Sequence, residues 1–231
     1  MSRAALDKRL SAPVSLGGLF GGGSSSEEDA FDNEAQEAVV VVGGETLRLL
    51  ERPFHPLNAN AVWPGAYVLA DWAVENHLRL SGKRLIELGS ATGAFALFAA
   101  RRGLFLTTSD CDDDEVEHAI AANFALNNLP PLPHLAHSWG TLVPPWARGA
   151  FHYVLASDIL LYVKSYPALV DTLEALCSPW EGRLGAVCVM SWQRRLRESD
   201  EFFALAARRG FRVVHLGRLV YELTWTLPEL D

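Results

Sequence analysis

The sequence predicts an α/β fold in which a mostly parallel sheet of seven strands lies between two layers of helices, a three-layer sandwich. Over residues 84–208, short apolar segments alternate with helical segments, which is typical of parallel strands joined by helices. The last two strand segments, 211–216 and 220–227, are separated by a short connection and must form an antiparallel pair. The sheet is therefore expected to contain one antiparallel strand.

Each element follows from its local pattern. A hairpin is expected at 38–42 and 46–50, because Gly43 and Gly44 supply a tight turn between two strand-like runs. The apolar run at 151–156 suits a strand that is buried on both faces. The remaining strands are expected at 84–88, 104–109, 134–137 and 185–190, and helices at 64–80, 94–100, 114–126, 167–176 and 200–208.

Two segments of different character divide the chain. Residues 1–35 are rich in glycine, serine and acidic residues and contain few apolar side chains, so we expect a disordered extension. Residues 36–231 contain the regular apolar patterns, and 49% of the whole chain is hydrophobic. We therefore expect one folded domain over 36–231, which begins with the hairpin.

Composition excludes several classes of partner. A net charge of −8 argues against a nucleic-acid-binding surface, which would be basic. The sequence contains no run of 18 apolar residues and no signal peptide, so no membrane partner is expected. Cys111, Cys177 and Cys188 form no CxxC pair, which favours a reducing compartment. We expect a monomer located in the cytoplasm, with the nucleus as a second location.

The most informative segment is the turn that follows the strand at 84–88. Glu87 lies near the end of this strand, and Gly89 opens a turn in which a ligand can approach bare backbone at a helix N-terminus. A dinucleotide motif would need glycines at 89, 91 and 94, but the chain has Ala91 and Ala94, and no phosphate-binding Gly-Lys-Ser/Thr follows. The Glu87 carboxylate, expected to face the crevice, would repel a pyrophosphate and attract S-adenosylmethionine (SAM), which carries a cationic amine and sulfonium. The alternative is a turn that serves packing alone.

Asp110 closes the second strand, 21 positions after Gly89. This spacing is close to that of the carboxylate that binds the ribose in βαβ nucleotide sites. The alternative is that Asp110 caps the following helix, but the acidic residues at 112–115 compete for that position. We therefore predict that Asp110 binds a ribose.

From about residue 60 to the C-terminus, the chain resembles the class I methyltransferases, a Rossmann-like fold of seven strands, and among them the family-16 lysine methyltransferases. The similar segments are 62–70, 88–93, 123–128, 139–140, 156–158, 192–195, 202–203 and 210–211. Their order and spacing together carry the resemblance.

The resemblance implies an enzyme that transfers methyl groups from SAM to a lysine of a protein substrate. It implies that the cofactor contacts, besides Glu87 of the same turn, are Trp63, Gly89, Ser90, Ala91, Gly93, Asp110, Trp139 and Ser157. An aromatic face such as that of Trp139 stacks well on a flat base. For Trp63 and Trp139, the alternative on position alone is ordinary packing in the core.

Asp158 is implied to face the methyl acceptor, where its carboxylate would orient the amine and balance the charge that develops on it. Its alternative role is to cap a helix or anchor a loop. The family has tyrosine three residues after this acid, whereas here Tyr162 follows by four. We expect Tyr162 to line the acceptor channel or to pack as an aromatic side chain.

Two further function classes remain open. One is a methyltransferase for small molecules or other side chains, and the other is a non-catalytic protein of this fold, favoured only by Ala91 in place of the usual glycine. A metal site is not expected, because His134 and His137 are three residues apart on a strand and no third ligand accompanies them.

Overall fold

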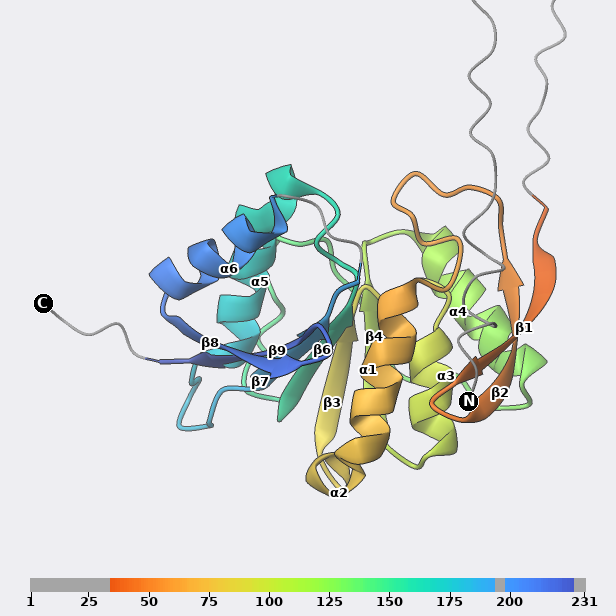
Figure 1. Cartoon of the computed structure of the whole chain (residues 1–231), viewed down its shortest axis with the longest axis horizontal. Helices are drawn as coiled ribbons and strands as arrows, with labels where there is room; N and C mark the ends of the chain where they lie inside the picture. Colours follow the sequence, from red (N-terminus) through yellow and green to blue (C-terminus); the bar gives the residue numbers. More distant parts are fainter. Residues whose placement is uncertain (1–33, 194–197, 227–231) are drawn as a thin grey trace, which may run out of the picture. The chain divides into compact units, whose positions relative to one another are not determined.

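The computed structural model describes residues 34–193 and 198–226, which form a seven-stranded sheet, a separate hairpin and the surrounding helices (Figure 1). The strands are β1 Gln36–Val42, β2 Glu45–Glu51, β3 Arg84–Leu88, β4 Phe105–Asp110, β5 His134–Ala136, β6 Tyr153–Ser157, β7 Val187–Ser191, β8 Phe211–Gly217 and β9 Val220–Trp225. The helices are α1 Pro64–Glu75, α2 His77–Leu80, α3 Ala94–Arg101, α4 Asp114–Leu126, α5 Tyr166–Cys177, α6 Ser199–Arg208 and the short 3₁₀ helix η2 Val163–Ser165.

The sheet has the strand order β5-β4-β3-β6-β7-β9-β8. β3 pairs in parallel with both β4 and β6, whereas β9 runs antiparallel to β7 and β8. The predicted fold class, including the one antiparallel strand, is confirmed. The strand order reverses beside β3, and open α/β sheets bind ligands at the carboxyl ends of the strands at such a point.

Alternate side chains of the strands enter two separate cores. Leu85 and Leu155 pack with α1, α3, α4 and the hairpin, whereas Ile86 and Val154 pack with α5 and α6. The strand period of two therefore sends neighbouring residues to opposite faces, each of which a helical layer covers (Figure 1). The three-layer arrangement agrees with the expectation from the sequence.

The hairpin β1–β2 is held to α4 by two asparagine side chains. Asn123 accepts a hydrogen bond from the backbone N–H of Leu50 (2.7 Å), and its own amide donates to the carbonyl of Thr92 (2.9 Å). Asn127 accepts from the N–H of Arg48 (3.1 Å) and donates to the carbonyl of the same residue (2.6 Å). The hairpin is thus tied both to α4 and to the turn after β3.

The prediction of a single helix at 64–80 is wrong, because the helix is interrupted at Asn76, which separates α1 from α2. The Asn76 side chain donates to the carbonyl of Trp72 (2.9 Å), and its backbone leaves the helical region at φ −110° and ψ 21°. This is the local competition with helical bonding that asparagine offers. The disorder expected at 1–35 falls largely outside the described residues. The strand expected at 220–227 ends earlier, at Trp225, and residue 227 lies outside the described residues.

Candidate functional site

A cavity of about 290 Å³ lies at the carboxyl ends of the central strands. Its walls come from the loop before α1, the turn after β3, the ends of β4, β5 and β6, and the start of α5. The lining residues are Leu57, Asn58, Ala59, Trp63, Gly89, Ala91, Asp110, Cys111, His137, Ser138, Trp139, Ser157, Asp158, Ile159, Leu161, Tyr162, Ser165 and Ala168. The cavity is close in size to the smaller ligand pockets of proteins.

Most of the residues predicted for the site meet in this cavity, although they come from five separate segments. Those that line it are Trp63, Gly89, Ala91, Asp110, Trp139, Ser157, Asp158 and Tyr162. Glu87, Ser90 and Gly93 do not line it. The expectation that the Glu87 carboxylate faces the crevice is therefore not met, because Glu87 lies on the central strand β3 and is 2% exposed.

The turn after β3 is held open by its backbone. Gly89 has φ 73°, and a Cβ atom there would lie 2.7 Å from Cγ2 of Ile159, so a side chain is excluded by both conformation and space. The N–H groups of Gly89 and Ser90 donate to the carbonyl of Ser109 (2.9 and 3.1 Å). Ala91 adopts φ 47°, a left-handed conformation that is unfavourable for alanine.

Glu87 is buried beside this turn, and its Oε2 atom has no hydrogen-bond partner among the described residues. Burial raises the pKa of this carboxyl to about 8, and the charge of Asp110 acts in the same direction, whereas a hydrogen bond from Ser90 lowers it. A buried carboxyl without a full set of partners is costly when ionised. A cationic group placed against it would remove that cost.

Asp110 fixes the position of the turn from the neighbouring strand. Its Oδ2 atom accepts from the N–H of Ala91 (2.7 Å), and its Oδ1 atom accepts from the N–H of Cys111 (2.8 Å). The alternative that Asp110 caps the next helix is wrong, because Asp113 caps α4 by accepting from the N–H of Glu115 (2.9 Å). Asp110 thus lies on the cavity wall with each oxygen able to accept a further bond.

Asp158 follows β6 and joins three elements. Its Oδ2 atom accepts from the N–H of Gly65 in the first turn of α1 (2.5 Å), and its Oδ1 atom accepts from the N–H of Gln193 after β7 (2.6 Å). Its backbone is left-handed, with φ 51°. The alternative in which Asp158 anchors a loop and caps a helix is therefore realised, and the carboxylate also lines the cavity.

The two tryptophans combine packing with exposure to the cavity. Trp63 is half-buried, and its indole N–H donates to the carbonyl of Asn58 (2.8 Å). Trp139 packs against the core on the side of α5 and α6 and also lines the cavity. Trp139 therefore both packs against the core and lies on the cavity wall, so its two predicted roles are compatible.

The loop residues Leu57, Asn58 and Ala59 form part of the cavity wall, and the sequence did not predict them. No local pattern marks them, and the bond of Asn58 to Tyr162 joins residues more than 100 positions apart. Cys111 was also missed, although it directly follows Asp110. Burial, with nearby Asp110, raises the pKa of the Cys111 thiol to about 12, so this residue stays a neutral thiol.

His134 and His137 are held by threonine hydroxyl groups. His134 Nδ1 lies 2.9 Å from Oγ1 of Thr108, and His137 Nε2 lies 3.3 Å from Oγ1 of Thr172. Within 34–193 and 198–226, no three histidine, cysteine or carboxylate side chains are grouped as metal ligands. Over the same residues, every helix is too short or too polar to cross a bilayer.

The family model and two of the curated proteins that the chain matches are described as lysine methyltransferases. A family model described as lysine methyltransferase matches residues 44–209. The chain is 30% identical over 170 residues to EEF1A lysine methyltransferase 3 of Xenopus tropicalis, which covers 72% of this chain and 70% of that protein. It is 29% identical over 157 residues to the protein N-lysine methyltransferase METTL21A of Danio rerio, covering 67% and 69% respectively.

The fold is also found among solved structures. The 16S rRNA N2 G1207 methyltransferase of T. thermophilus, solved with AdoMet and guanosine, superposes with a TM-score of 0.61 at 18% identity. The match covers 87% of this chain and 53% of that one. At this identity the similarity establishes the shared fold alone.

Proposed function

Because the chain belongs to the family of lysine methyltransferases, we propose that the cavity at the carboxyl ends of β3, β4 and β6 is where it methylates a lysine side chain of a protein substrate. The enzyme is a SAM-dependent methyltransferase. The observation that carries the proposal for this cavity is that Asp110, at the end of β4, and Asp158, directly after β6, both lie on its wall.

The residues fit SAM. The turn after β3 presents Gly89 and Ala91 to the cavity, so SAM can approach bare backbone there. Glu87 is buried behind this turn and does not line the cavity, so we assign it no direct contact with the cofactor. We assign the ribose hydroxyl groups to the free acceptor capacity of Asp110, and the adenine ring to the faces of Trp63 or Trp139. Ser90 and Gly93 would act by shaping the turn, and Ser157 by lining the wall.

Bound SAM supplies a methyl group that its positive sulfur already activates, so the protein's task is chiefly alignment. An acceptor lysine must lose its proton, because an ammonium group has no lone pair with which to attack. The Asp158 carboxylate, held by two backbone N–H groups, would orient the amine and balance the positive charge that develops on nitrogen. This proposal requires no covalent nucleophile from the protein.

We propose a protein rather than a nucleic acid or a membrane as partner. The net charge of −8 suits a lysine-bearing surface, and two of the relatives are named for EEF1A lysine and protein lysine methylation. We further propose a monomer with residues 1–35 as an extension and 36–231 as the catalytic domain. The free Cys111, Cys177 and Cys188 favour the cytoplasm, with the nucleus as a second location.

The test is to incubate the purified protein with methyl-labelled SAM and lysate from cells whose proteins are undermethylated, and then to hydrolyse the labelled product. We expect label in methyl-lysine of one protein band, and none with the Asp110→Ala variant. Label in a different amino acid would overturn the lysine assignment. Label only in small molecules would overturn the protein substrate.

A further inference from the structure

Tyr162 forms a contact that its position in the sequence does not suggest. It lines the cavity and is partly exposed, and its hydroxyl group donates to the carbonyl of Pro56 (3.3 Å) and accepts a short hydrogen bond from the side-chain amide of Asn58. These partners belong to the loop between β2 and α1, more than 100 residues earlier in the chain. Tyr162 thus joins the segment after β6 to that loop.

Asn58 is hydrogen-bonded to both Tyr162 and Trp63. Its backbone carbonyl accepts the indole N–H of Trp63 at 2.8 Å, while its side chain bonds to Tyr162. Asn58 holds a left-handed backbone, with φ 59°, which asparagine tolerates better than most residues. Tyr162, Asn58 and Trp63 all line the same cavity and form one hydrogen-bonded series.

The loop that carries Asn58 is ordered by its own contacts. The buried His55 accepts through Nδ1 from the N–H of Leu57 (3.1 Å) and of Ala59 (3.4 Å). Asn58 N–H donates to the carbonyl of His55 (2.9 Å). These bonds order the backbone around Asn58, and Tyr162 adds the contacts that hold the Asn58 side chain and the Pro56 carbonyl to the segment after β6.

We propose that Tyr162 is a positioning residue for the cofactor, which acts through Asn58 to orient the indole of Trp63. The inference rests on the proposed function only in that Trp63 contacts bound SAM. It assigns Tyr162 to the cofactor side of the cavity and not to the acceptor channel. An indole that is already oriented loses less conformational freedom on binding than a mobile one.

Two single variants and their combination test this series. Tyr162→Phe keeps the ring and removes the hydroxyl group, and Asn58→Gly keeps the left-handed backbone and removes the amide. We expect each to weaken SAM binding, measured by calorimetry on the full chain, by about 3- to 10-fold. The double variant should weaken it no further than the stronger single variant, because both remove the same interaction.

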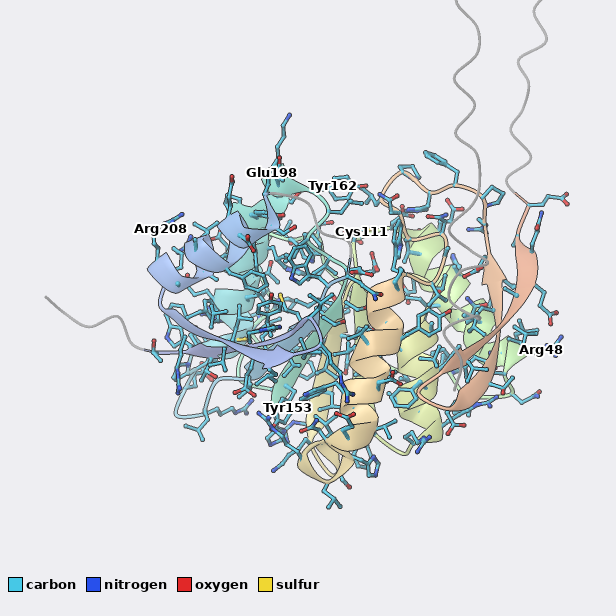
Figure 2. The ribbon with its side chains drawn as sticks, viewed as in Figure 1. Arg48, Cys111, Tyr153, Tyr162, Glu198 and Arg208 are labelled. Atoms are coloured by element: carbon cyan, nitrogen blue, oxygen red, sulfur yellow. The ribbon has the colours of Figure 1, made fainter. Side chains whose placement is uncertain are left out.

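Tyr153→Phe is the matched control. Tyr153 begins β6 at the opposite end from Tyr162, and its hydroxyl group accepts from Nε of Arg79 (2.9 Å), away from the cavity (Figure 2). We expect this variant to bind SAM as the wild type does. Circular dichroism on all variants would show that each is folded.

The outcomes separate the possible roles. Unchanged SAM affinity in Tyr162→Phe, with a higher KM for the methylated protein, would place Tyr162 in the acceptor channel and overturn the proposal. If the losses of SAM affinity in Tyr162→Phe and Asn58→Gly added up in the double variant, the two residues would act independently, and the proposed hydrogen-bonded series would be overturned. Wild-type protein that fails to bind SAM would instead overturn the proposed function of the cavity.

Discussion

Glu87 combines near-complete burial with a carboxyl oxygen that has no hydrogen-bond partner among the described residues. Its pKa of about 8 in the folded protein lies above the ordinary value of 4.5. Between these two pH values the folded state binds more protons than the unfolded chain. The carboxyl group therefore lowers the stability of the free protein as the pH rises through this window, by up to about 1.4 kcal/mol per pH unit.

Glu87→Gln should remove this pH dependence, because glutamine has the same shape and does not ionise. At pH 8 we expect the free energy of unfolding to exceed that of the wild type by about 1–3 kcal/mol. Urea unfolding at several pH values between 5 and 8 measures the effect. Glu201→Gln, at an exposed position in α6, is the control, and wild-type and Glu87→Gln curves of equal slope would contradict the prediction.

Ala91 stores backbone strain in the turn after β3. Its left-handed φ of 47° is costly for alanine and accessible to glycine. We expect Ala91→Gly to raise the free energy of unfolding by about 0.5–1 kcal/mol. The same change at Ala121, exposed in the middle of α4, should lower it by about 1 kcal/mol. If both substitutions changed the free energy of unfolding in the same direction, measured by urea unfolding, Ala91 would not be strained.

At the scale of elements, Asp158 connects β6, α1 and the segment after β7. Besides the carboxylate bonds to Gly65 and Gln193, the Asp158 N–H donates to the carbonyl of Ser191 (2.9 Å). The Ser191 hydroxyl group in turn donates to the carbonyl of Gly65 (2.7 Å). The carboxylate also faces the positive end of the α1 dipole, which favours a negative charge. The wall of the cavity is thus assembled by contacts between elements.

Gly65→Ala should break this connection. A Cβ atom at position 65 would lie 2.7 Å from Cγ of Asp158, so the carboxylate must move away from its N–H donors. We expect the free energy of unfolding to fall by about 2–3 kcal/mol and methyl transfer to decrease. In an Asp158→Ala background the added methyl group should cost much less. Chemical unfolding of the two single variants and the double variant measures this coupling, and additive losses would refute it.

For the molecule as a whole, cofactor binding and folding are linked. A ligand that binds only the folded state at 100 times its Kd adds about 2.7 kcal/mol of stability. For a domain of this size we expect SAM to raise Tm by about 5–10 °C in thermal unfolding. Asp110→Ala should lose most of this shift, whereas Asp112→Ala, an exposed neighbour outside the cavity wall, should keep it. An unchanged shift in Asp110→Ala would contradict the ribose assignment.

Several elements could be predicted from the sequence because their signals are local. The expected bounds of β3 and α4 agree with the structure, since a short apolar strand and an acidic helix start depend on residues a few positions apart. Asp110 was predicted from its spacing after Gly89, whereas Trp139 and Asp158 were implied by the family resemblance, and all three line the cavity. The break at Asn76 was missed, because the apolar pattern continues to Leu80 across it.

The sequence by itself determined the order of the elements, the parallel sheet with its one antiparallel strand, and eight of the 18 residues that line the cavity. Only the tertiary structure decided that Glu87 is buried, that Asp158 is bound by backbone N–H groups, and that Tyr162 contacts Asn58. The physical reason is distance along the chain. Asp158 is 93 residues from Gly65, and Tyr162 is 104 residues from Asn58, so these contacts arise only when packing of the layers brings the segments together.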